Sequence, residues 1–191
     1  KDILREKHCF SSEDFILVYV AELSNRKNQS LLIEAVNMLE RNIPNIKLLL
    51  VGKGDKSNEY SSLIEKYNLQ KKVFLMGYRT DVNEIMSLSD IAVSSSKQEG
   101  LPVNIIEAMA IGLPLVVSDT RGNRDLVVDG SNGFIYPLND LDSLVKHLLR
   151  LYNNPKLREE LSVFGLNEIK KYSVESIVLQ LRSIYEDING K

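Results

Sequence analysis

The chain of 191 residues is 43% hydrophobic and 26% charged, which is ordinary for a globular domain with a sizeable core. Its 24 basic and 26 acidic residues leave a net charge of -2, so the basic footprint that nucleic-acid binding needs is missing. The single cysteine, Cys9, excludes an internal disulfide framework and suits a reducing compartment, and no run of about 18 apolar residues is present to span a membrane.

Short β-branched runs alternate with helical patterns up to residue 137. The predicted strands are 15–20, 46–52, 72–77, 90–95, 114–119 and 133–137, and the predicted helices are 27–42, 59–68, 81–89, 102–111 and a brief one near 123–128. This alternation, with nearly continuous apolar strands, predicts an α/β fold with a doubly wound, Rossmann-like parallel sheet covered by helices on both faces. Ligands of such sheets bind at the carboxyl ends of the strands.

From about residue 140 onward the pattern is only helical, over 140–153, 155–171 and 173–189. The last of these carries an apolar stripe that needs a cover; its members are Val174, Ile177, Val178, Leu181, Ile184, Tyr185 and Ile188. The first 14 residues lack clean periodicity. We therefore divide the chain into the end of a connection (1–14), a ligand-binding domain (15–172) and a tail helix (173–191).

The start of the chain shows no targeting signal, and neither histidine indicates a metal site. The chain opens at Lys1 without an apolar signal region, and a missing initiator Met is what we expect of a fragment or a processed product. His8 and His147 have no acidic or cysteine neighbours in the sequence at metal-ligand spacing, so we expect ordinary surface or packing residues and no metal site.

A glutamate lies in the apolar helix predicted over 102–111. Pro102 fits its first turn and Gly112 its end. At 100° per residue, Glu107 projects between Val103 and Ile111. A carboxylate there either loses hydration, at a cost of several kcal/mol unless it is hydrogen-bonded, or opens onto a cavity where a ligand supplies donors.

Two loops after strands contain residues suited to anions. Arg26 and Lys27 precede a helix, where the macrodipole disfavours cations; they form either a solvated turn or a site for an anion such as a diphosphate. Gly52 and Gly54 give an incomplete dinucleotide motif because Ser57 replaces the third glycine. No acidic residue stands at the end of the third predicted strand, which reads "FLMGYR", to hold a ribose, and this argues against a nicotinamide or flavin oxidoreductase.

The stretch from Glu99 to Gly133 resembles the group 1 (family 4) glycosyltransferases, which retain anomeric configuration and use nucleotide-sugar donors. The matching elements, in order, are Glu99-Gly100-Leu101-Pro102, Glu107-Ala108-Met109-Ala110, Gly112-Leu113-Pro114, Ser118-Asp119, Gly122 and Val128-Asp129-Gly130-Ser131-Asn132-Gly133. Two glutamates at this spacing recur by chance, whereas the ordered set does not. Resemblance continues upstream through "AELSNRKN", "LLLVGKGD" and "FLMGYR".

The resemblance implies a role for each matching residue. Glu99 would hold hydroxyls of the transferred sugar, with Gly100 beside it, and Glu107 would accept hydrogen bonds from the ribose. The main-chain N–H groups of Gly100 and Leu101 would point at the diphosphate. Lys27 would neutralise the leaving diphosphate as the glycosidic bond breaks, and main-chain groups near Tyr78 and Arg79 would bind the base.

Two departures from the family pattern affect this interpretation. The family usually places an arginine where this chain has Glu22, and Arg26 is the residue that could substitute. The family's common Gly-Gly-x-Pro-Glu loop reads Arg121-Gly122-Asn123-Arg124-Asp125, which resembles a subset linked to surface polysaccharide assembly. Asp125 is either part of this loop's function or simply an acid in the first turn of a helix.

The family has two doubly wound domains, the GT-B architecture, and this chain resembles only the second, donor-binding one. The resemblance implies that the tail helix packs on the first domain, which would also carry the acceptor and any peripheral contact with the inner face of the membrane. We expect a cytoplasmic retaining hexosyltransferase that uses a UDP-sugar and no metal. The alternatives are a nucleotide-sugar epimerase of the same architecture and a non-catalytic nucleotide-sugar-binding module.

Overall fold

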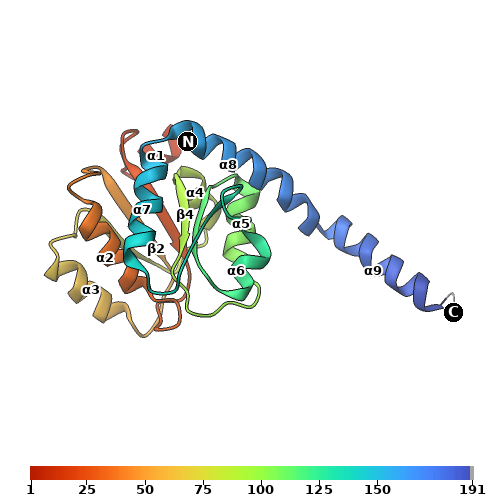
Figure 1. Ribbon diagram of the computed structural model, residues 1–191. Coiled ribbons are helices and arrows are strands. Elements are labelled where there is room, and N and C mark those ends of the chain that lie inside the picture. The colour runs from red at the N-terminus through yellow and green to blue at the C-terminus, as the bar shows by residue number, and fades with distance from the viewer. Residues whose placement is uncertain (190–191) are drawn as a thin grey trace.

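The computed structural model describes residues 1–189, which contain a six-stranded, all-parallel sheet of order β3-β2-β1-β4-β5-β6 (Figure 1). The strands are β1 (Phe15–Val20), β2 (Ile46–Val51), β3 (Val73–Gly77), β4 (Ile91–Ser94), β5 (Leu115–Ser118) and β6 (Gly133–Tyr136). The predicted doubly wound parallel sheet is confirmed. Each predicted strand is present, with ends that differ by one residue at most.

Helices cover both faces of this sheet (Figure 1). The helical segments within residues 1–189 are α1 (Asp2–Lys7), α2 (Gln29–Leu39), α3 (Ser57–Lys66), α4 (Val82–Leu88), α5 (Val103–Ile111), α6 (Arg121–Leu126), α7 (Leu141–Tyr152), α8 (Pro155–Glu168), a 3-10 turn (Ile169–Tyr172) and α9 (Val174–Asn189), of which α9 extends away from the sheet. Along β1, Leu17 and Tyr19 point to the core layer under α2, α3 and α7, whereas Ile16 and Val18 point to the layer under α4, α5 and α6. Burial on both faces explains why the strands read as continuous apolar runs.

The predicted helix over 102–111 is α5. Pro102 precedes its first residue, and Gly112 ends it in the left-handed conformation with φ of 80°. The helix expected from residue 27 begins only at Gln29, because Asn28 is left-handed with φ of 55°. Arg26 and Lys27 therefore belong to the loop that leads from β1 into α2.

The first 14 residues include a helix that the sequence did not predict. Arg5 of α1 is buried and donates hydrogen bonds to the main-chain oxygen of Leu88 at 3.0 Å and to Asp90 at 2.8 Å. Phe10 packs edge-on against Phe74 with ring centroids 5.5 Å apart. The segment thus packs on the body of the domain, and its role as a connection to another domain stays a prediction.

The last helix, α9, extends outward from the body of the domain beyond α8 (Figure 1). Its described apolar side chains are exposed, from 49% for Leu181 to 73% for Val174. The side chains of Ile177, Ile184 and Ile188, which belong to the predicted stripe, lie outside the described residues. Within residues 1–189, no helix combines the length and the apolar character needed to cross a membrane.

Candidate functional site

Two loops meet where the strand order reverses, between β1 and β4, which is the position where doubly wound sheets bind ligands. Three hydrogen bonds that involve main-chain atoms join the loops. The Lys97 amide donates to the Arg26 carbonyl at 2.9 Å, and the Ser95 hydroxyl donates to the Lys27 carbonyl at 2.8 Å. The Arg26 guanidinium donates to the Gln98 carbonyl at 3.3 Å. The backbone of each loop therefore fixes the position of the other.

The two predicted catalytic side chains form an ion pair across this junction. Lys27 Nζ lies 2.5 Å from Glu99 Oε1, although the residues are 72 positions apart. The two side chains are 12% and 6% exposed, so water screens the pair poorly. Arg26 lies beside it, with Nη1 3.9 Å from Glu99 Oε2. The sequence predicted a cation and a carboxylate at this edge, and the fold brings them into contact.

A buried polar layer lies under Glu99. The Ser96 hydroxyl donates to Glu99 Oε1 at 2.5 Å, and the Tyr19 hydroxyl lies 2.6 Å from Ser96 Oγ. Burial raises the pKa of Tyr19 well above its ordinary value, so this phenol keeps its proton. Sequence reasoning missed Ser96 and Tyr19. The signal available was the run Ser94-Ser95-Ser96, which places three hydroxyls at the end of an otherwise apolar strand.

A cavity of about 670 Å³ opens beside the ion pair. Its lining residues are Lys97, Gln98, Glu99, Gly100, Asp119, Thr120, Arg121 and Asp125. The Gly122 amide donates to the Glu99 carbonyl at 3.2 Å and so ties α6 to this wall. The interpretation of Asp125 as a first-turn acid is wrong: α6 begins at Arg121, earlier than predicted, which places Asp125 in the second turn, facing the cavity.

Glu107 has a different environment from the one its neighbours in the sequence suggest. It is exposed on α5, which buries Ile105, Ala108 and Met109 against the sheet. Val103, one turn earlier, is exposed as well. Among the described residues, Glu107 takes part in no hydrogen bond or ion pair and does not line the cavity beside Glu99. Its carboxylate is therefore hydrated, and its role toward a ribose stays a prediction.

The predicted base-binding residues follow β3. Arg79 donates two hydrogen bonds to Asp81, at 2.8 and 2.6 Å, and this pairing lowers the pKa of Asp81. Tyr78 is largely exposed and lines a separate hollow of about 330 Å³ with Arg79, Thr80 and Asp81. β3 lies three strand spacings from β4, so the two strands are about 14 Å apart across the sheet. The structure does not bring these two groups into contact.

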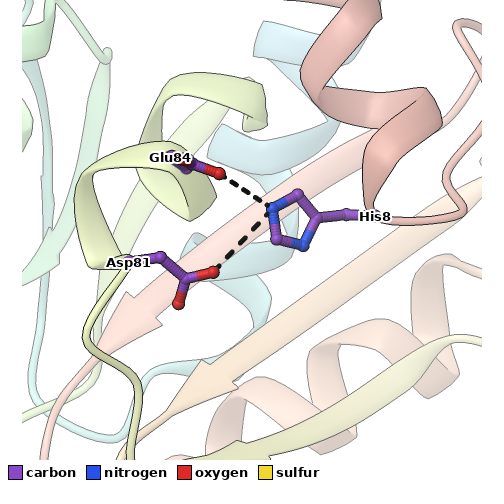
Figure 2. A group of neighbouring side chains, drawn as sticks. All are labelled: His8, Asp81 and Glu84. Atoms are coloured by element: carbon purple, nitrogen blue, oxygen red, sulfur yellow. Dashed lines mark hydrogen bonds and ion pairs between the residues drawn. The ribbon is translucent and has the colours of Figure 1, made fainter.

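One group of described side chains has metal-ligand chemistry. His8 Nε2 lies 3.4 Å from Glu84 Oε2 and 4.0 Å from Asp81 Oδ2 (Figure 2). The expectation that His8 lacks acidic neighbours is wrong in space, because the fold joins segments 76 positions apart. The same oxygens are held by Lys7 at 2.5 Å and by Arg79 at 2.6 Å. This group is therefore explained as an ion-pair network that fastens α1 to α4.

The other predicted features have structural explanations. His147 stacks on Phe134 with centroids 4.7 Å apart, and burial lowers its pKa, as expected of a packing residue. The glycines after β2 are packing positions. A Cβ at Gly52 or Gly54 would lie 2.0 or 2.1 Å from the carbonyl oxygens of Ala21 and Leu23, so only glycine lets the loops after β1 and β2 approach this closely.

A doubly wound parallel sheet with a cation and a carboxylate at its switch point defines an α/β ligand-binding domain. The family described as glycosyl transferases group 1 matches residues 1–166, and the chain belongs to this family. The predicted fold, that of a carboxy-terminal domain of a GT-B glycosyltransferase, is confirmed.

Three similar proteins illustrate the match. EpsD of Bacillus subtilis (strain 168), which is named provisionally as a glycosyltransferase, is 38% identical over 182 residues, 95% of this chain and 48% of its own length. The UDP-Gal:alpha-D-GlcNAc-diphosphoundecaprenol alpha-1,3-galactosyltransferase of Escherichia coli is 32% identical over 91% of this chain and 46% of its own length. A crystal structure of a point mutant of S. aureus TarM with fondaparinux, alpha-GlcNAc-glycerol and UDP superposes with a TM-score of 0.84 at 28% identity, covering 91% of this chain and 36% of that one. The chain thus spans about half the length of these two curated relatives.

Proposed function

We propose that the chain binds a nucleotide-sugar donor, most simply a UDP-sugar, at the junction of β1 and β4. As part of a longer protein it would transfer the sugar, with retention, to a glycan or lipid-linked acceptor in surface polysaccharide synthesis. The relatives support this choice, because the Escherichia coli protein is named for a UDP-galactose donor and the TarM structure contains UDP.

The Lys27–Glu99 ion pair is the observation that carries the proposal. A cation and a carboxylate 2.5 Å apart beside a cavity of about 670 Å³ suit a ligand with a diphosphate at one end and hydroxyls at the other. Lys27, assisted by Arg26, would stabilise the charge that develops on the leaving diphosphate. Glu99 would hold hydroxyls of the sugar. These cations take the place that a divalent metal has in other nucleotide sites, so we propose transfer without a metal.

The remaining contacts follow the same edge of the sheet. The main-chain N–H groups of Gly100 and Leu101, just before α5, would bind the diphosphate. Glu107, exposed on α5, would accept hydrogen bonds from the ribose. Main-chain groups near Tyr78 and Arg79 would bind the base in the hollow after β3.

Titration calorimetry with UDP, GDP, ADP and inorganic pyrophosphate tests this proposal. We expect one nucleoside diphosphate to bind, and Lys27→Ala to weaken it by about 1–3 kcal/mol, the usual effect of losing a charged hydrogen-bond partner. Lys56→Ala is the matched control, because Lys56 lies in the loop after β2 and pairs with Glu59. No nucleotide binding at all would refute the proposal.

Glu107→Gln separates the ribose from the diphosphate in the same experiment. It should weaken UDP binding and leave pyrophosphate binding nearly unchanged, since pyrophosphate has no ribose. Equal losses for the two ligands would exclude Glu107 from the ribose contact.

A further inference from the structure

We propose, on the basis of the function proposed above, that Ser96 and Tyr19 are positioning residues for Glu99. They form a hydrogen-bond chain that holds one oxygen of the Glu99 carboxylate from the buried side of the site. The sugar-binding geometry of Glu99 then depends on two side chains that contact no ligand.

The direction of this chain follows from the chemistry of its members. An ionised carboxylate only accepts hydrogen bonds, so the single Ser96 proton goes to Glu99 Oε1, 2.5 Å away. Ser96 Oγ must then accept from the Tyr19 hydroxyl at 2.6 Å. The Tyr19 oxygen in turn accepts from the Ser94 hydroxyl at 3.4 Å. Each proton in the chain therefore has one possible acceptor, and the chain points toward Glu99.

The chain is rigid as well as directed. Tyr19, Ser94 and Ser96 are all at most 1% exposed. The Ser118 hydroxyl donates to the Ser96 carbonyl at 2.5 Å, and Asn123 donates to the Ser118 carbonyl at 2.9 Å. These contacts come from β5 and α6, so neighbouring elements restrain Ser96 from the other side.

We expect the hydrogen bond from Ser96 to Glu99 to matter most when a donor is bound. Lys27 and Ser96 both contact Glu99 Oε1, which leaves Oε2 with more free lone pairs. If Lys27 turns to the diphosphate, Glu99 loses its nearest cation. Among the described residues, Ser96 is then the side chain that still donates to Oε1 at hydrogen-bond distance. It would keep Oε2 directed at the sugar hydroxyls.

The test compares dissociation constants for UDP and for UDP-glucose, UDP-galactose and UDP-N-acetylglucosamine, measured by calorimetry on the 191-residue chain. The readout is the ratio of the UDP constant to that of the tightest UDP-sugar, which isolates the contribution of the sugar. Ser96→Ala should lower this ratio by about tenfold and Tyr19→Phe by about threefold, because losing one hydrogen-bond partner has effects of this order. Both should change UDP binding itself by less than about twofold.

Two further variants distinguish positioning from general destabilisation. Ser96→Thr keeps the hydroxyl and should restore most of the ratio. Tyr136→Phe is the matched control for Tyr19→Phe: Tyr136 is also fully buried, but its hydroxyl donates to the Ser94 main-chain oxygen at 3.0 Å and lies outside the chain to Glu99. It should destabilise the fold without changing the ratio.

The outcomes separate this inference from the proposed function. A wild-type chain that binds none of the nucleotides overturns both. Normal UDP binding with an unchanged ratio in Ser96→Ala and Tyr19→Phe overturns the positioning role alone. Should Ser96→Ala fail to fold by circular dichroism, Tyr19→Phe decides: an unchanged ratio in that variant overturns the inference.

Discussion

Lys27 makes its strongest contact with Glu99 in the structure, yet its proposed task is to bind a diphosphate. Both side chains are about nine-tenths buried, and opposite charges at 2.5 Å in such surroundings attract strongly. A diphosphate must therefore compete with the carboxylate for the same ammonium group. The affinity of the site for phosphates is the difference between these two interactions.

Removing the carboxylate charge should strengthen phosphate binding. In Glu99→Gln, Lys27 is no longer neutralised, so we expect pyrophosphate to bind up to about tenfold more tightly, a gain of about 1.4 kcal/mol. UDP-sugars should lose their advantage over UDP. Calorimetry with both ligands checks this, and Glu22→Gln, which removes the same charge from an exposed position on the loop after β1, is the control. Equal gains in the two variants would mean that only the overall charge matters.

Gly122 is a second residue on which the site depends. A Cβ there would lie 2.3 Å from the Gly100 carbonyl oxygen and 3.0 Å from the Glu99 carbonyl carbon, and both are backbone atoms that yield little. Gly122→Ala should therefore push α6 away from the Glu99 loop. We expect a loss of about 1–3 kcal/mol in the free energy of unfolding, as for other overpacked positions, together with loss of UDP-sugar binding.

Urea denaturation gives the stability change in Gly122→Ala, and Gly100→Ala is its control for stability. No atom lies within 4 Å of a Cβ at Gly100, so this variant should unfold close to the wild type. Similar destabilisation in the two variants would contradict the steric explanation.

At the scale of elements, the strands and most helices could be predicted because their local patterns agree with their final burial. Continuous apolar runs gave the strands, and Pro102 with Gly112 gave the bounds of α5. Helix α1 could not be predicted, since Arg5 owes its burial to Leu88 and Asp90, far along the chain. The Tyr19–Ser96 contact joins residues 77 positions apart, and a tyrosine in a strand gives no sign of such a partner.

For the candidate site, the sequence predicted where some residues lie, and their roles stay predictions. The positions of Lys27 and Glu99 at one edge of the sheet follow from the strand pattern. Their proposed roles come from the resemblance of the surrounding motifs to the family. The environment of Glu107 was harder to predict. Val103, one helical turn earlier, is apolar and suggests a buried face, yet it is exposed. Helical spacing shows which residues share a face, but only packing shows whether that face is covered.

Helix α9 presents apolar side chains without a described cover, and exposed apolar surface promotes association. We expect the 191-residue chain to associate with increasing concentration in analytical ultracentrifugation. Leu181→Glu, or truncation after Tyr172, should reduce this association. Arg182→Gln, on the same helix but polar and paired with Glu186, should not. A monomer at millimolar concentration would contradict the expectation.

At the scale of the whole molecule, the chain spans about half the length of EpsD and of the Escherichia coli galactosyltransferase. Transfer requires an acceptor hydroxyl held against the anomeric carbon, and such orientation accounts for roughly 7–11 kcal/mol of the barrier. We place the acceptor surface outside this chain, so the chain alone should bind UDP but transfer no sugar to an acceptor preparation. Incorporation of radiolabelled sugar from the donor into the acceptor preparation measures this transfer. Robust turnover that Glu99→Ala abolishes would contradict a site shared between two domains.

The sheet consists of two halves that are each continuous in sequence, β1 to β3 and β4 to β6. They join through β1 and β4, whose register includes only Leu17 with Ile91 and Val18 with Ala92, whereas β1 and β2 pair over six positions. The Lys27–Glu99 contact lies across this join. A donor bound at Lys27 and Glu99 would therefore contact both halves and stabilise their junction. It should slow hydrogen exchange of the amides between β1 and β4 more than of those between β1 and β2.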